Sequence, residues 1–513
     1  GRTEAPPPAP DATFVGLKRA LPDPIGWLLG RSYEGIVPPG SGELFRFPPA
    51  RSFLLGADDP LWNVAPGPFR PALSLARGGL AVGWGANAVT WDEDDLRDFP
   101  FPARELAEPY RQAAARFEIA GPTRDDLSPF YPGLEPTQPP VRLREHDRLL
   151  LAAYARRRRS IVRRRSIHLG RARLAVVTDP ARDDACRYLA RCLWGCPKGA
   201  IYDPARTTLR ECERYPQFRY RPGRFVRFLE ARGDRVTAIE FLDDAGASRT
   251  EPVEAVVLAA GAIQTGAILI RTLARDAGLA AGLPRPISTL SVLDTRMVKV
   301  PYVQLRAIGG ADPEDGFLFN RLLAGHVVEG RGPWPRFVHG EILSLTSLLY
   351  HPLIESLPLG SRASSRLFFA LKSAIGVVTW FLPDRPVPGR GLRLEADPAS
   401  RIGDRLHVDW AEPPGLEDLV RSVVGDTRRA LLDLGCLASP GGAITAPPGS
   451  GIHYGGTVPM RREPDPRACD PRGKSHAYSN LHVADGAAFP VLPSKSLTLT
   501  LAAHAIRVAE GLP

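Results

Sequence analysis

The chain has few cysteines and no apolar run long enough to span a membrane. Its 6 cysteines among 513 residues are too sparse for a disulfide-stapled scaffold. The longest apolar stretches, Val256–Ile270 and Leu367–Phe381, are short and are interrupted by polar or charged residues. The hydrophobic share of 44% and the charged share of 24% are typical of a globular protein. We therefore expect a soluble, cytoplasmic chain with room for two domains.

Three of the cysteines, Cys186, Cys192 and Cys196, lie close together in the sequence. A zinc or iron–sulfur site would need a fourth ligand nearby, and the cluster has no Cys-x-x-Cys pair. We predict that these cysteines are structural and buried, that they are not a redox pair, and that the protein has no metal site.

Lysine is also scarce, so the net charge of +10 rests mainly on arginine. The densest basic run is Arg156–Arg165, and a helical pattern over 149–155 leads into it. A basic surface can bind nucleic acid or anionic lipid, but no nucleic-acid motif occurs. We interpret the run as a solvated helix face, with an anion or lipid contact as the alternative.

The last sixty or so residues carry the most informative pattern. Leu481–Ala484 alternate like a strand, Asp485-Gly486 form a turn, and a helix is expected from Thr498. Upstream lies the Gly-rich segment Gly451–Thr457, which contains His453. A strand, a turn with a carboxylate and a helix N-terminus bring backbone N–H groups and an Asp together, which can hold a polar cofactor.

This pattern resembles the C-terminal part of the glucose–methanol–choline (GMC) family of flavoprotein oxidoreductases. His453-x-x-Gly456-Thr457 and Val483-Ala-Asp-Gly-x-x-Phe-Pro490 match its motifs. The segment Cys192-x-x-Gly-Cys-Pro is similar to the bacterial branch that acts on sterols, sugars and long-chain alcohols. The resemblance implies an α/β (α+β composite) fold, in which a Rossmann-like FAD-binding domain is interleaved with a substrate domain built on a mixed or antiparallel sheet with helices.

The resemblance also implies domain boundaries. The FAD-binding domain would comprise 1–110, 166–295 and 448–513, and the substrate-binding domain 111–165 and 296–447. Within the second domain, strand-like runs occur at Met297–Leu305 and Gly391–Leu394. Apolar helices are expected around Glu341–Tyr350 and Arg366–Phe381, and another helix at Leu416–Leu434.

A second matching segment is the Gly-rich loop that lines the flavin in this family. Its counterparts here are Gly78, Gly79, Trp84, Gly85 and Asn87. Leu80 and Ala81 replace the usual hydroxyl residues, and the loop has no His to which flavin could be attached. We therefore expect non-covalent FAD.

A third match lies at Glu254–Thr265, where an apolar strand ends at a glycine and a helix follows. The remaining cofactor-binding positions that the resemblance implies are Val226 (against adenine), Ala260, Gly261, Thr265, Asp485, Gly486 and Thr498.

The start of the chain departs from the family. Its members open with a strand, Gly-x-Gly-x-x-Gly and a helix that seats the dinucleotide. The first residues here are Pro-rich and irregular, without that fingerprint. Three explanations are open for the missing dinucleotide-binding segment: it was removed or left out of this sequence, it sits on another polypeptide, or the protein has lost it. We favour the first explanation, in which the natural N-terminus lies upstream of Gly1.

Alcohol oxidation needs a base for the hydroxyl proton and an acceptor for the hydride, roles that imidazole and the flavin N5 can fill. His453 is the expected base. Relatives carry Asn or His where this chain has Ser496, which cannot act as a base at neutral pH. Lys495 beside it could polarise a substrate oxygen. The catalytic group is thus His453 alone or His453 together with Ser496, or else the catalytic function is impaired.

Two functions remain open at this point. The first is an FAD-dependent oxidation of the CH–OH group of a small organic, sugar or polycyclic alcohol. The second is a non-oxidase use of the fold, either a lyase or isomerase with structural flavin or a flavin-free binding protein. The electron acceptor (oxygen, quinone or cytochrome) and the oligomeric state cannot be read from the sequence. No nucleic-acid partner is expected.

Overall fold

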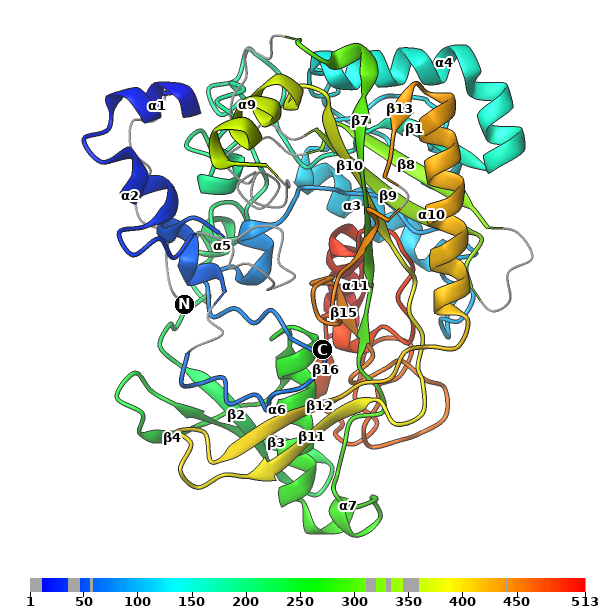
Figure 1. The fold of residues 1–513 in the computed structure, drawn as a ribbon. Helices are drawn as coiled ribbons and strands as arrows, with labels where there is room; N and C mark the ends of the chain where they lie inside the picture. Colours follow the sequence, from blue (N-terminus) through cyan, green and yellow to red (C-terminus); the bar gives the residue numbers. More distant parts are fainter. Residues whose placement is uncertain are drawn as a thin grey trace.

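The computed structural model describes residues 12–35, 47–55, 59–310, 320–328, 334–344, 359–439 and 441–512. A large sheet with helices on one side forms one half of the molecule, and smaller sheets surrounding a buried helix form the other (Figure 1). The predicted irregular segment 1–12 lies almost entirely outside the described residues.

The large sheet is antiparallel throughout. Its strand order is β1 (Ile167–Arg171), β8 (Leu322–Val327), β9 (Phe337–Ser344), β10 (Ile375–Phe381), β7 (Met297–Gln304) and β13 (Cys436–Leu437), with β14 (Ile444–Thr445) also paired to β7. Helices α4 (Glu145–Arg165) and α10 (Leu416–Asp433) cover one face. Alternate strand residues, such as Val298, Val300 and Tyr302 of β7, enter the core beneath these helices. The residues between them lie on the opposite face.

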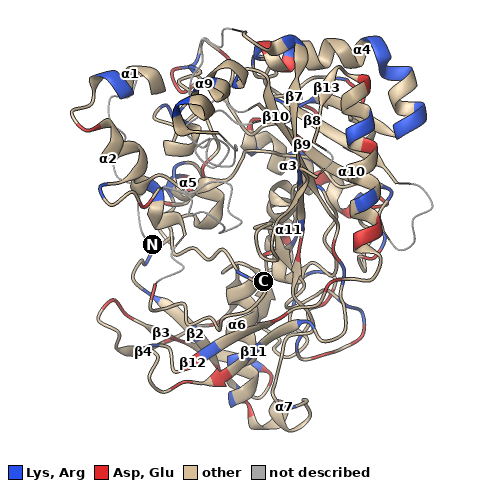
Figure 2. Cartoon of the chain, in the orientation of Figure 1, with Lys and Arg blue, Asp and Glu red and all other residues tan. Residues whose placement is uncertain are grey.

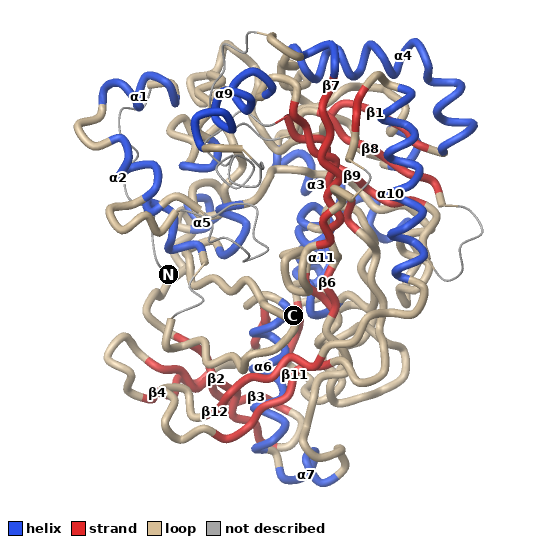
Figure 3. Tube along the Cα trace, viewed as in Figure 1, coloured by secondary structure: helices blue, strands red, loops and turns tan. Residues whose placement is uncertain are grey.

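The other half is built around α6 (Ala262–Arg275), whose first twelve residues are all buried. Figure 3 shows its neighbouring strands below the large sheet. They are the antiparallel β2 (Phe225–Arg232), β3 (Arg235–Leu242) and β4 (Ser248–Pro252), and the parallel pair β5 (Val256–Leu258) and β16 (Leu481–Val483). The two remaining strand pairs are β11 (Gly391–Ala396) with β12 (Asp404–Asp409), and β6 (Leu293–Asp294) with β15 (Tyr454–Gly455).

The remaining helices cover these sheets or lie at the N-terminal side of the molecule. Helix α11 (Thr498–Glu510) packs against α3 (Ala107–Phe117). The others are α1 (Phe14–Ala20), α2 (Pro24–Leu29), α5 (Thr208–Cys212), α7 (Ala277–Ala281) and α9 (Ser361–Leu371).

The composite α/β fold class is confirmed: helices are combined with antiparallel sheets and one short parallel pair. The helices predicted at 416–434 and from Thr498 are confirmed as α10 and α11, and the strand-like runs at 297–305 and 391–394 are confirmed as β7 and β11. The helix predicted over 366–381 is wrong beyond Leu371, because residues 375–381 form β10 in the centre of the sheet. The helix predicted at 341–350 is also wrong at its start, which belongs to β9, and 345–350 lie outside the described residues.

The basic run forms the C-terminal part of α4, and Figure 2 shows Lys and Arg concentrated there. Arg156, Arg159, Arg163 and Arg164 are exposed, while Leu150, Tyr154 and Ile161 of the same helix are buried against the sheet. This placement agrees with a solvated helix face. Within the described ranges, no helix is both long and apolar enough to cross a membrane.

Candidate active site

The Asp485 carboxylate joins two of the segments that the sequence singled out. It accepts hydrogen bonds from the Gly261 N–H (2.8 Å), the Thr265 hydroxyl (2.6 Å) and the Ala487 N–H (2.9 Å). Burial raises the pKa of Asp485, because a buried carboxylate loses its hydration, while these three donors oppose the shift. The carboxylate thereby fixes the turn after β16 against the N-terminus of α6.

Gly261 is the N-cap residue just before α6 and has a φ of +83°, a conformation that favours glycine. Ala260 and Gly261 are exposed, and a Cβ at Gly261 would meet nothing within 4 Å. The first N–H groups of a helix have no acceptor within the helix, so this end offers donors toward open space. Gly79 (φ +65°) and Gly85 likewise have open space where a Cβ would stand. These residues fit a flat, polar cofactor approaching the backbone closely.

The other predicted cofactor positions lie around these segments. Trp84 donates its indole N–H to the Tyr202 carbonyl (2.9 Å). The Val226 carbonyl accepts from the Gln264 side chain on α6 (3.1 Å). Thr498 is the first residue of α11 and remains partly exposed. The contacts of all these residues with FAD stay predictions.

Gly261 offers a test of the cofactor cradle that does not depend on turnover. Gly261→Ala should lower the flavin affinity about tenfold or more, because the methyl group enters the open space and the positive φ strains an alanine by about 1 kcal/mol. Gly233→Ala is a matched control, since Gly233 (φ +59°) also has open space but lies in the β2–β3 turn. Flavin fluorescence titration would measure both variants. Equal flavin affinity in the two would contradict the cradle.

Asn87 and Ser496 meet beside the large sheet. The Ser496 hydroxyl donates to the Asn87 carbonyl (2.9 Å), and the Asn87 amide donates to the Glu341 carboxylate on β9. The Asn87 amide also lies 3.2 Å from the Asn320 side-chain oxygen. Burial raises the pKa of Glu341 to about 7, so this carboxyl group can hold or release a proton near neutral pH.

His453 lies at the end of the large sheet, on the face opposite α4 and α10. Its ring is stacked on Phe381 of β10, with 5.4 Å between ring centroids. Its Nδ1 lies 3.1 Å from the Thr295 hydroxyl, and its carbonyl accepts from the Thr295 N–H (3.3 Å). Burial lowers the pKa of His453 to about 4, so the imidazole is neutral at ordinary pH. The Nε2 atom has no hydrogen-bond partner among the described residues.

His339 on β9 is a second buried imidazole that the sequence did not single out. Its Nδ1 lies 3.1 Å from the Tyr131 hydroxyl, and its ring centroid lies 6.2 Å from that of Phe381. Burial lowers its pKa to about 3. His339 and Glu341 share one face of β9, because side chains on a strand alternate. The segment Phe337–Ser344 has adjacent apolar pairs rather than a regular alternation, so no local pattern marked either residue.

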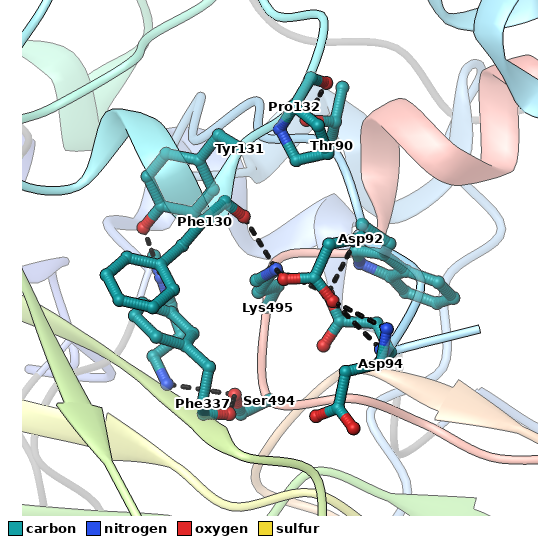
Figure 4. Close-up of polar contacts among 12 residues, drawn as sticks. Thr90, Asp92, Asp94, Phe130, Tyr131, Pro132, Phe337, Ser494 and Lys495 are labelled. Carbon is teal, nitrogen blue, oxygen red and sulfur yellow. Dashed lines mark hydrogen bonds and ion pairs between the residues drawn. The ribbon is translucent and has the colours of Figure 1, made fainter. Parts of the chain in front are cut away.

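Lys495 lies in a buried network of ion pairs and hydrogen bonds. Its fully buried ammonium group donates to Asp92 (2.9 Å), to Asp95 and to the Phe130 carbonyl (2.7 Å), as Figure 4 shows in part. An ammonium group has three N–H donors, and all three are engaged. The suggestion that Lys495 polarises a substrate oxygen is therefore corrected: the lysine ties the 92–95 turn to the segment before α11.

The cysteine prediction holds only in part. Cys186, Cys192 and Cys196 are half-buried rather than buried. The reason is that Cys192 and Cys196 line a small cavity next to Trp84. Within the described ranges, no group of three or more His, Cys, Asp and Glu side chains is placed to hold a metal ion.

Comparisons with known proteins give a family match for the C-terminal part of the chain. Residues 443–505, which contain His453, Asp485 and Ser496, match the family model for GMC oxidoreductase. Pyridoxine 4-oxidase from Mesorbium loti has a similar structure, with a TM-score of 0.54 and 16% identity over 83% of this chain and 81% of that chain. So does an FAD-dependent oxidoreductase from Chaetomium thermophilum in complex with a fragment, with a TM-score of 0.54 and 14% identity over 90% of this chain and 92% of that chain. No curated protein sequence matches the chain.

At these low identities the two structures establish only that the chain shares their fold. The C-terminal match adds the family signature around the candidate base and the Asp485 turn.

Proposed function

We propose that this protein oxidises the CH–OH group of a small-molecule alcohol, with His453 as the base and FAD bound non-covalently. The observation that carries the proposal is the environment of His453. The ring is fixed between Phe381 and Thr295, it is neutral because burial lowers its pKa to about 4, and Nε2 has no partner among the described residues.

The hydrogen bond to Thr295 decides which nitrogen can act. When Nδ1–H donates to the Thr295 hydroxyl, the proton-free Nε2 can accept the hydroxyl proton of the substrate. The Cα–H hydrogen must leave with its electron pair as the carbonyl forms. Bound FAD would supply the two-electron acceptor for that hydride. Gly79, Gly85, Gly261 and the Asp485 turn are the residues that would hold the cofactor.

The test is a visible absorption spectrum of the flavin-loaded protein before and after anaerobic addition of a panel of alcohols. Bleaching of the flavin bands by one alcohol, with formation of its aldehyde or ketone, is the expected result. Flavin bands that no alcohol bleaches, across primary, secondary, sugar and polycyclic members, would contradict the proposal.

The pH dependence of the reaction should follow His453. A base works only when deprotonated, and the pKa of His453 is lowered to about 4. We therefore expect kcat/KM to stay nearly constant as the pH falls from 8 to 5, and to fall about tenfold per pH unit below about 4. Initial rates measured after brief transfer to each pH would check this. A loss of activity with a midpoint near the ordinary histidine pKa of 6.5 would contradict it.

A non-oxidase role is the second candidate, and one observation favours it. The Ser496 hydroxyl donates to the Asn87 carbonyl and Lys495 is committed to carboxylates, so neither supplies a second proton-transferring group. A lyase or isomerase could then use His453 alone while FAD stays structural. Such a protein would convert its substrate under anaerobic conditions without bleaching the flavin.

A further inference from the structure

The face of the large sheet that carries the candidate base also carries a row of polar side chains. Glu341 on β9 lies opposite Thr379 on β10, and Thr379 lies opposite Lys299 on β7. The next row contains Phe381, on which His453 stacks. Residues two apart on a strand are about 6.6 Å apart, so the polar row lies about that far from the row that contains Phe381.

The register fixes the side of the sheet on which Lys299 lies. Its neighbours Val298 and Val300 belong to the core beneath α4 and α10. Lys299 therefore projects to the opposite side, as Phe381 and Glu341 do on their strands. Lys299 and Phe381 are diagonal neighbours across β7 and β10, a spacing of about 7–8 Å.

Lys299 has no hydrogen-bond or ion-pair partner among the described residues. Burial alone lowers its pKa to about 8, with no opposing charge nearby. The nearest carboxylate in the row is that of Glu341, which lies two strands from Lys299, a distance of about 10 Å between strands. Glu341 already accepts a hydrogen bond from the Asn87 amide. A partly desolvated ammonium without a partner costs free energy, and an anion that binds it recovers that cost.

We propose that Lys299 forms a subsite for a carboxylate group carried by the alcohol substrate. This subsite deepens the proposed function and rests on it. Because His453 stacks on the residue diagonal to Lys299, the carboxylate and the reacting hydroxyl should be separated by about the length of one aromatic ring. Hydroxyalkyl aromatic acids have this spacing.

The test compares 4-(hydroxymethyl)benzoate with the neutral 4-methylbenzyl alcohol on the flavin-loaded protein. Calorimetry gives the affinity of each compound and anaerobic flavin reduction gives the rate. The wild type should favour the carboxylate, and Lys299→Met should weaken its binding about tenfold or more while changing the neutral compound less than about twofold. Lys299→Arg, which keeps the cation, should retain the preference, and the exposed Lys474→Met should behave as wild type.

Equal binding of the two compounds by the wild type would overturn the subsite, as would an equal loss for both in Lys299→Met with an unchanged circular dichroism spectrum. The two proposals fail separately. Carboxylate binding that depends on Lys299 without any alcohol oxidation would retain the subsite and reject the oxidase. Oxidation of neutral alcohols without a carboxylate preference would retain the oxidase and reject the subsite.

Discussion

Replacing His453 by Asn is expected to lower kcat/KM for alcohol oxidation about a thousandfold, the typical contribution of a general base. The asparagine amide can still hydrogen-bond to the Thr295 hydroxyl and lie against Phe381, so the shape of the site is kept. It cannot accept the substrate proton. Stopped-flow measurement of anaerobic flavin reduction by the best alcohol of the panel would give the rate.

Two measurements make this result specific to the base. The flavin content of His453→Asn should equal that of the wild type, because the cofactor cradle at Gly261 and Asp485 is untouched. Thr295→Val should reduce the rate far less, about tenfold, because it removes the orientation of the imidazole but keeps the base. Wild-type rates of flavin reduction in His453→Asn would reject His453 as the base.

The local backbone geometry on the proposed cofactor side could be predicted from the sequence, because its residues stand in short motifs. Asp485 follows a strand and Gly261 lies just before a helix, and each motif fixes its own local geometry. The pairing of these two motifs is visible in the structure as the bond from the Gly261 N–H to the Asp485 carboxylate. Turn residues and helix starts depend on neighbours in the chain, so they can be read from the sequence.

The substrate side could not be predicted in the same way. Residues 375–381 are apolar enough for a buried helix, and only their pairing with β7 and β9 decides that they form a strand. The same pairing puts Glu341, Thr379 and Lys299 in one row. Contacts between strands distant in the sequence leave no local pattern. The domain boundaries therefore stay predictions.

The role of Lys495 also could not be predicted, because its partners are distant in the sequence. The resemblance implied a catalytic position at its neighbour Ser496, so a catalytic role for Lys495 was a reasonable hypothesis. The partners that exclude this role, Asp92 and Asp95, lie about four hundred residues earlier. Nothing in the sequence connects the turn that contains them to the segment before α11.

Replacing Lys495 by Met is expected to lower the free energy of unfolding substantially. The ammonium and the Asp95 side chain are almost fully buried, and Asp92 is partly exposed. Removing the cation leaves two neighbouring carboxylates without their partner. Breaking a buried ion pair in this way typically costs about 3–5 kcal/mol of unfolding free energy. Urea unfolding of Lys495→Met and of the exposed control Lys474→Met would measure the difference, and a loss below about 1 kcal/mol would contradict the expectation.

The pH dependence and a double variant would show that charge, not packing, causes the loss. Burial raises the pKa of Asp95 to about 7, and the Lys495 charge opposes that shift, so the variant should raise it further. A carboxyl group whose folded pKa lies above its unfolded value of about 3.9 stabilises the fold at low pH and loses that contribution as the pH rises toward the folded pKa. Lys495→Met should therefore cost more at pH 8 than at pH 5. Adding Asp95→Asn should recover part of the loss at pH 8, because the amide needs no counter-ion, whereas a purely steric defect would show neither effect.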